Sequence, residues 1–233
     1  MGKRGPRPKK KQIVWSPNIA YGVGLFATDG CLYNDYRHLD FTSKDREQLK
    51  NFKKCFNVRA KVSYKTSGFS DKKYPRLQWG DVNLIRFFIS VGLTPKKSKT
   101  IGVLAIPDEY FFDFVRGHHD GDGSFHSYWD RRWRSSFMYY LIFSSASKNH
   151  IDWIQGSLSR MLGVRGHVTC AGKTGELYQL KYAKREALKI IKKMYHVPTA
   201  ICLNRKKKKI FKALKVDNLT NRARVAKLAD APA

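Results

Sequence analysis

The spacing of apolar residues predicts an alternation of helices and strands whose order occurs twice along the chain. Apolar residues three or four positions apart indicate amphipathic helices, and short stretches of alternating apolar and polar residues indicate strands. In the first half, helices are predicted over residues 16–30, 45–56 and 82–91. Strands are predicted within residues 31–41 and over residues 60–66 and 76–79. The first half is therefore predicted to run α-β-β-α-β-β-α.

The second half has the same predicted order, followed by one further helix that is strongly basic. Its helices are predicted over residues 107–121, 151–162, 184–195 and 204–214. Its strands are predicted over residues 124–129, 136–144, 167–171 and 176–182. This matching order predicts an α+β fold built from two pseudo-symmetric αββαββα repeats, residues 13–105 and 106–216.

Short stretches of sequence also match between the halves. Residues 39–43 are similar to residues 141–145, and residues 58–62 are similar to residues 164–168, at separations of 102 and 106 residues. A repeated order of elements, with sequence matches at corresponding places, indicates a duplication.

The two opening helices end in the same arrangement of glycine and aspartate. Gly24 and Gly117 each precede a second glycine by six positions, and Asp29 and Asp122 stand just before that second glycine. Glycine lets two helix backbones approach closely, so a packed pair of helices would bring the two carboxylates together. Adjacent carboxylates repel each other, and the negative end of each helix adds to the repulsion, which a divalent cation relieves.

These segments resemble the paired signature of LAGLIDADG homing endonucleases. The second copy, RGHHDGDGSF at residues 116–125, is the closer match, whereas the first, YGVGLFATDG at residues 21–30, keeps Gly, Asp and Gly in place. The resemblance extends over residues 16–214, because α-β-β-α-β-β-α is also the family's repeat. It implies two four-stranded antiparallel sheets that form a homing-endonuclease saddle over DNA, and two motifs in one chain imply a monomer.

The resemblance also implies a metal-dependent nuclease site. Asp29 and Asp122 would bind Mg²⁺, or another divalent cation such as Mn²⁺, with the backbone carbonyls of Thr28 and Gly121 nearby. The cation would activate water and stabilise the leaving oxygen of each phosphodiester. The implied function is site-specific cleavage of both strands of double-stranded DNA. Two alternatives on the same fold stay open, a maturase that binds intron RNA and a DNA-binding regulator that does not cleave.

The charge balance favours nucleic acid as the partner. The chain has 46 Lys and Arg against 18 Asp and Glu, a formal net charge of +28, and such a surface attracts polyanions. Candidate DNA contacts lie in or near predicted strands and after the prolines at 95 and 198. They are Arg37, Arg76, Arg131, Arg132, Arg134, Lys97, Lys99, Arg205 and Lys206. A solvated basic face explains the last four equally well. Residues 1–12 are expected to be a flexible basic arm, and residues 217–233 a disordered tail.

Other conspicuous residues have simpler explanations. Ala27 stands in the first repeat where Asp120 stands in the second, so Asp120 is interpreted as a helix-end or packing residue. The adjacent histidines at 118–119 would point about 100° apart on a helix and would not converge on one zinc ion. Asp45 follows the second strand, where polar residues of the family help to orient water, and Asn149 is its loose equivalent.

Cysteine spacing and hydropathy bear on the cellular setting. The four cysteines form no CxxC pair, so neither a zinc knuckle nor a disulfide scaffold is expected. The sequence has no run of 18 apolar residues and no signal-peptide core, so no membrane partner is expected. The expected setting is intracellular and reducing, in a cytoplasm or an organellar matrix rather than secreted.

Overall fold

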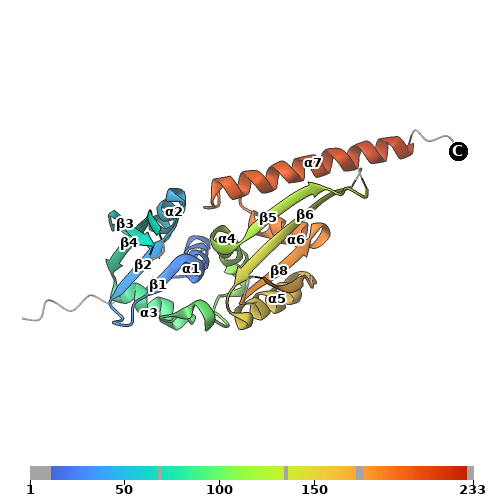
Figure 1. Cartoon of the computed structure of the whole chain (residues 1–233). Helices are drawn as coiled ribbons and strands as arrows, with labels where there is room; N and C mark the ends of the chain where they lie inside the picture. The colour runs from blue at the N-terminus through green and yellow to red at the C-terminus, as the bar shows by residue number, and fades with distance from the viewer. Residues whose placement is uncertain (1–11, 68–69, 134–135, 172–175, 230–233) are drawn as a thin grey trace, which may run out of the picture.

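The computed structural model describes residues 12–67, 70–133, 136–171 and 176–229. Arg134 and nearly all of the predicted basic arm lie outside the described residues. Two sheet-bearing halves flank a central pair of helices, and a long C-terminal helix runs beside the second half (Figure 1). None of the helices in the described ranges is long and apolar enough to cross a membrane.

The first half begins with a helix at the predicted position. The Ser16 Oγ accepts a hydrogen bond from the Ile19 backbone nitrogen at 3.3 Å, and Pro17 fits the first turn because that turn needs no backbone donor. The elements of this half are α1 (Pro17–Asp29), β1 (Gly30–Leu32), β2 (His38–Thr42), α2 (Arg46–Phe56), β3 (Val62–Ser67), β4 (Ser70–Gly80) and α3 (Val82–Val91). The strands form one antiparallel sheet in the order β1-β2-β4-β3.

The second half repeats this topology. Two short 3₁₀ turns, η1 (Lys97–Lys99) and η2 (Asp108–Tyr110), lie in the connection between the halves. The following elements are α4 (Phe111–Asp122), β5 (Ser124–Trp129), β6 (Phe137–Ser145), α5 (Lys148–Leu162), β7 (His167–Ala171), β8 (Leu177–Ala183), α6 (Lys184–Met194) and α7 (Asn204–Ala229). Their sheet has the order β5-β6-β8-β7, and its strands are antiparallel. The predicted order of elements and the α+β class are confirmed.

Strand register separates an apolar and a polar face in each sheet. In the first sheet, Phe41 pairs with Leu77 on the face that packs against the helices, and both side chains are buried. Asp40 and Arg76 alternate with these residues and therefore lie on the opposite face. In the second sheet, Phe125, Tyr139 and Leu141 are buried on the apolar face. His126 and Tyr140 alternate with them and lie on the opposite face. We call the faces that carry Asp40 and Arg76 in one sheet, and His126 and Tyr140 in the other, the polar faces.

Helices α1 and α4 pack against each other at the centre of the molecule (Figure 1). A Cβ atom on Gly24 would lie 2.2 Å from the Phe114 carbonyl oxygen, and one on Gly117 would lie 2.0 Å from the Tyr21 carbonyl oxygen. The helix backbones are thus in direct contact at these two positions, and any larger residue would force them apart. This confirms the close approach that the two glycines predict.

The structure differs from the sequence prediction at the ends of two helices. The helix predicted from Pro107 begins at Phe111, because Pro107 is extended and the 3₁₀ turn η2 intervenes. The last helix continues to Ala229, so most of the segment expected to be a disordered tail is helical. Asp217 accounts for part of this extension, since it is only 4% exposed and pairs with Lys184. This partly buried ion pair, together with Val216, which packs against the core, holds the helix beyond its predicted end.

Candidate active site

The C-terminal ends of α1 and α4 meet at the centre of the molecule. A Cβ atom on Gly121 would lie 1.9 Å from the Thr28 Oγ1, so the two helix ends are in contact immediately before Asp29 and Asp122. Asp29 is half-buried and Asp122 is exposed. The structure therefore brings the two predicted catalytic aspartates, and the two residues predicted to offer backbone carbonyls, to one place.

The two carboxylates share an electrostatic environment that disfavours their charged forms. Burial, together with the nearby Asp122 charge, raises the pKa of Asp29 to about 6, against the opposing effects of Gln48, Lys206 and Thr28. The surrounding protein also raises the pKa of Asp122, although that side chain is exposed, and Lys206 and Lys97 oppose the shift. Desolvation of both carboxylates, and the repulsion that Asp122 exerts on Asp29, favour a bound cation.

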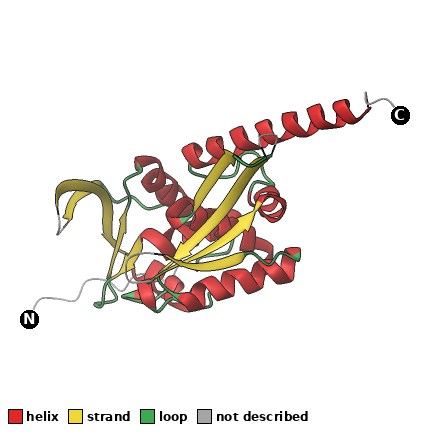
Figure 2. Cartoon of the chain, turned by 45° about the vertical axis from the view of Figure 1, so that its right-hand side comes forward, coloured by secondary structure: helices red, strands yellow, loops and turns green. Residues whose placement is uncertain are grey.

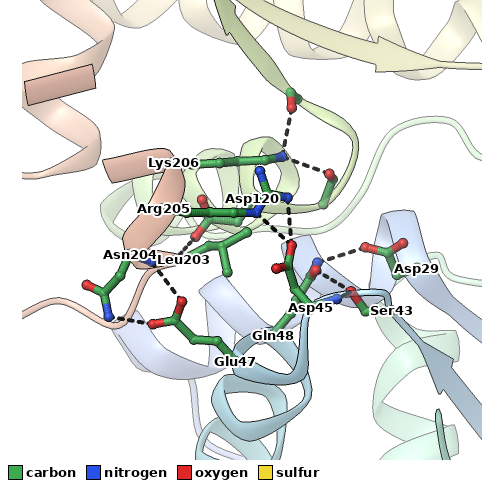
Figure 3. Close-up of polar contacts among 12 residues, drawn as sticks. Asp29, Ser43, Asp45, Glu47, Gln48, Asp120, Leu203, Asn204, Arg205 and Lys206 are labelled. Carbon is green, nitrogen blue, oxygen red and sulfur yellow. Dashed lines mark hydrogen bonds and ion pairs between the residues drawn. The ribbon is translucent and has the colours of Figure 1, made fainter. Parts of the chain in front are cut away.

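Gln48 is a site residue that the sequence reasoning missed. Its Nε2 donates a hydrogen bond to the Asp29 Oδ2 at 2.8 Å, and its side chain is 3% exposed (Figure 3). The Ser43 Oγ donates to the Gln48 Oε1 at 2.6 Å and accepts from the Asp45 backbone nitrogen at 3.2 Å. The sequence does carry a signal, because Asp45 and Gln48 have the spacing of a helix capping box. That pattern alone would have assigned Gln48 to the helix end rather than to Asp29.

Among the described residues of the second half, none has a role equivalent to that of Gln48. The residue 102 positions after Gln48 is His150. Its Nδ1 lies 2.8 Å from the Gly102 carbonyl oxygen, so its side chain does not have the role that Gln48 has. Ser145 repeats part of the arrangement, because its Oγ accepts from the Ser147 backbone nitrogen at 3.1 Å. By position and by this contact, Asp45 corresponds to Ser147 and not to Asn149. The site is therefore asymmetric beyond its two aspartates.

Two lysines reach the residues that follow the aspartates. The Lys97 Nζ donates to the Gly30 carbonyl oxygen at 2.5 Å. The Lys206 Nζ donates to the carbonyl oxygens of His119, Gly121 and Gly123 at 2.7, 2.9 and 2.7 Å. Each lysine thus places a positive charge at the negative end of one helix of the pair. Burial lowers the pKa of each lysine to about 8, while the nearby carboxylates oppose the shift.

Each lysine lines a cavity beside the aspartates. One cavity, of about 330 Å³, is bounded by Gly123, His126, Arg205, Lys206 and Lys209 among others. The other, of about 320 Å³, includes Thr28, Lys97 and Asp122. Each cavity contains a cationic side chain that can pair with a phosphate group, and this charge offsets the negative end of the adjacent helix.

The start of α7 makes hydrogen bonds and an ion pair with residues of both halves. The Arg205 guanidinium donates to the Asp45 Oδ2 at 2.6 and 2.8 Å, and the Asn204 backbone nitrogen donates to Glu47 at 3.1 Å (Figure 3). The Leu203 backbone nitrogen donates to the Asp120 Oδ2 at 2.6 Å. These contacts fix the segment that carries Lys206.

Asp120 lies behind the site rather than in it. Its side chain is 1% exposed, and its Oδ2 also accepts from the Tyr21 hydroxyl at 2.8 Å. The neighbouring histidines are buried as well, and burial lowers the pKa of His119 to about 3. Among the described residues, no three His, Cys, Asp or Glu side chains are grouped so as to hold a metal ion. The donors at the helix ends are the two aspartates and backbone carbonyls.

The other predicted DNA contacts have varied positions. Arg76 lies on the polar face of the first sheet, where its Nη1 is 3.1 Å from the Asp40 Oδ2. Arg37 is exposed in the turn between β1 and β2, and Arg131 and Arg132 are exposed in the turn between β5 and β6. Lys99 does not reach the aspartates, because its Nζ pairs with Glu176 at 3.0 Å. Of the two lysines that follow Pro95, Lys97 therefore lies beside the aspartates and Lys99 does not, and the contact of either with DNA stays a prediction.

Known proteins match this chain by structure and not by sequence. No protein-family model and no curated protein matches it. The homing endonuclease I-WcaI, bound to its DNA recognition sequence, has a TM-score of 0.60 and 12% identity, covering 88% of this chain and 93% of that one. I-DmoI in complex with DNA and Ca has a TM-score of 0.51 and 16% identity, covering 76% and 88%. The N-terminal LAGLIDADG domain of DUF199/WhiA has a TM-score of 0.51 and 15% identity, covering 78% and 83%.

The chain therefore has the LAGLIDADG fold, which confirms the resemblance between its two sequence motifs and the family signature. The fold occurs both in proteins described as homing endonucleases and in DUF199/WhiA, so the fold by itself does not assign DNA cleavage to this chain.

Proposed function

We propose that the protein is a site-specific double-strand DNA endonuclease that acts as a monomer, with one catalytic aspartate from each repeat. The observation that carries this proposal is the meeting of Asp29 and Asp122 at the ends of two helices in backbone contact. A structural role does not require two carboxylates to lie near each other there, because their repulsion is unfavourable.

The oxygen donors of the site suit a hard divalent cation. Asp29 and Asp122 offer carboxylates, and Thr28 and Gly121 offer backbone carbonyls, the ligand types that Mg²⁺ and Mn²⁺ prefer. The Gly121 carbonyl accepts from Lys206 and keeps a second lone pair. When bound, the cation would supply an activated water and charge stabilisation for phosphodiester hydrolysis. I-DmoI has been solved with DNA together with Mg, Mn or Ca, which supports the same cofactor class here.

The surrounding residues would hold the reacting groups in place. Gln48 orients the Asp29 carboxylate through its hydrogen bond to Oδ2. Lys97 and Lys206 would offset the charge of the phosphates beside each aspartate, within the cavities they line. The polar faces of the two sheets would contact the major groove, with Arg76 held by Asp40 in a fixed position for a base edge. The partner is therefore double-stranded DNA.

A non-cleaving DNA-binding regulator is the second candidate, because the site is complete in only one half. Asp122 lacks a glutamine equivalent to Gln48, since His150 contacts Gly102 instead. On this alternative the protein binds its target and leaves it intact.

The test is cleavage of a plasmid that carries the sequence into which the gene itself is inserted, with Mg²⁺ present. The wild-type protein is expected to linearise the plasmid, and Asp29→Asn and Asp122→Asn are expected to bind without cutting. A wild-type protein that binds the DNA but never cuts it supports the regulator. A protein that binds intron RNA and not this DNA supports a maturase. Variants that cut at the wild-type rate would show that the aspartates have been wrongly assigned.

A further inference from the structure

Helix α7 turns one stripe of its surface toward the second half. Ile210, Ala213 and Asp217 are buried at three- and four-residue spacing, as expected for the inner face of a helix. The ion pair between Asp217 and Lys184 anchors this stripe, and α7 packs against β5 and β6. These contacts fix which side of α7 faces the second half and which side faces solvent.

The opposite side of α7 carries a row of lysines. Lys208, Lys209, Lys212 and Lys215 are all exposed. At about 100° of rotation per residue, they lie within an arc of about 120° that faces away from the buried stripe. None of them has a carboxylate within ion-pair distance in the part of the chain that the structure describes. We call these four residues the α7 lysine row.

The α7 lysine row begins beside the candidate active site. Lys209 lines the same cavity as Lys206, Gly123 and His126, and His126 belongs to the polar face of the second sheet. From there α7 runs outward beside β5 and β6, as Figures 1 and 2 show from two directions. The lysines therefore extend from the ends of the central helices along the flank of the second half.

We propose that the α7 lysine row binds the phosphate backbone of the DNA duplex beyond the stretch contacted by the sheets. This inference rests on the proposed function. A row without acidic partners gains most from a polyanion, because each phosphate contact releases condensed counterions. Lys208 and Lys215 are about 10 Å apart along the helix axis at about 1.5 Å per residue. That length spans about three phosphates of one strand at about 3.4 Å each.

The described part of the first half contains no helix that matches α7. After α3, the chain passes through η1, which carries Lys97, and then leads into α4. The added contact is therefore expected on one side of the target only, next to the second repeat.

The experiment compares two triple variants with equal changes in charge. The first replaces Lys208, Lys212 and Lys215 with Gln and leaves Lys209 intact, because Lys209 lines the cavity beside the site. The control replaces Lys189, Lys192 and Lys193, which are exposed lysines of α6, a helix that packs on the apolar face of the second sheet. Affinity for the target duplex is measured with Ca²⁺ at several salt concentrations, and hydroxyl-radical footprints are recorded.

The α7 variant is expected to lower the slope of log affinity against log salt by about 2.7, or about 0.9 for each lost phosphate contact. Its footprint is expected to shorten on the second-repeat side alone, while the control keeps the wild-type slope and footprint. Equal losses in both variants, or no loss in the α7 variant, would overturn the proposal. If the wild-type protein does not bind the duplex at all, the proposed function itself fails, and that result is separate.

Discussion

The side-chain amide nitrogen of Gln48 lies 2.8 Å from the Asp29 Oδ2, and this contact has no counterpart beside Asp122. The orientation of that amide depends on Ser43. The Ser43 hydroxyl accepts from the Asp45 backbone and so has its one proton free to donate to the Gln48 Oε1. The amide nitrogen is left facing Asp29. Ser43 thus acts through Gln48 to orient the hydrogen bond that Asp29 accepts.

Replacing Ser43 with Ala should disturb the half of the site that contains Asp29. Loss of one oriented hydrogen bond is expected to slow cleavage of one DNA strand roughly five- to tenfold, since such a bond contributes about 1 kcal/mol. The other strand should be cut nearly as fast as before, so nicked plasmid should accumulate. A time course on supercoiled plasmid measures this.

Ser145→Ala is the matched comparison, because Ser145 makes the same turn contact but serves no glutamine. It is not expected to produce the same bias toward nicked product. An equal bias in both variants would mean that the turn, and not the orientation of Gln48, matters. Ser43→Thr, which keeps a hydroxyl, should restore balanced cleavage.

The raised pKa of Asp29 gives a signed prediction for stability. Its pKa in the folded protein is about 6, above the ordinary value of 3.8. The folded state therefore binds the proton more tightly, and stability contributed by the neutral form is lost as pH rises from about 4 through about 6. At pH 7.5 without divalent cation, Asp29→Asn should be more stable than wild type by roughly 1–2 kcal/mol, after allowance for partial exposure.

Thermal unfolding across pH 4 to 8 checks this. The advantage of Asp29→Asn should shrink as the pH falls toward about 4, because the wild-type carboxyl is then neutral too. Added Mg²⁺ should raise the melting temperature of wild type more than that of the variant. A variant that is less stable than wild type at every pH would contradict the electrostatic account.

The close contact of α1 and α4 predicts a large penalty for any side chain at Gly117. Gly117→Ala would place its Cβ 2.0 Å from the Tyr21 carbonyl oxygen, so the helices must separate. We expect destabilisation of more than about 3 kcal/mol and loss of the active-site geometry. Gly156 in α5 provides the control, since no atom lies within 4 Å of its added Cβ. Gly156→Ala should stabilise the protein by about 0.5–1 kcal/mol in urea unfolding. Similar losses at both positions would refute the packing argument.

Lys206 should contribute to stability as well as to DNA cleavage. Its Nζ is the donor for three backbone carbonyls at the end of α4, and Lys206→Met removes all three hydrogen bonds. The carbonyls would lose their partner at the negative end of a helix, at an expected cost of about 1–3 kcal/mol. Lys208→Met, two residues along and on the outer side of α7, should cost less than about 0.5 kcal/mol. Urea unfolding of the two variants tests the difference, and equal costs would contradict it.

Local patterns predicted the elements well and the polar contacts poorly. The apolar spacing located every helix of the repeats, and the glycine pairs predicted where α1 and α4 touch, because both signals lie in short stretches of sequence. Gln48 reaches Asp29 only after α2 has packed beside α1, so no local pattern assigns it there. Lys206 lies 84 residues beyond Asp122. Its position beside the site depends on the hydrogen bond from the Leu203 backbone nitrogen to Asp120. The continuation of α7 past Leu214 is stabilised in part by the ion pair between Asp217 and Lys184, which apolar periodicity does not register.

The central claim is tested most directly by strand-resolved cleavage of a target duplex labelled at both 5′ ends, with Mg²⁺. Wild type should cut both strands at one site, and Asp29→Asn and Asp122→Asn should bind the duplex with unchanged affinity in Ca²⁺ while cutting neither strand at more than about one thousandth of the wild-type rate. Wild-type rates in either variant, or a wild-type protein that binds the duplex and leaves both strands intact, would contradict it.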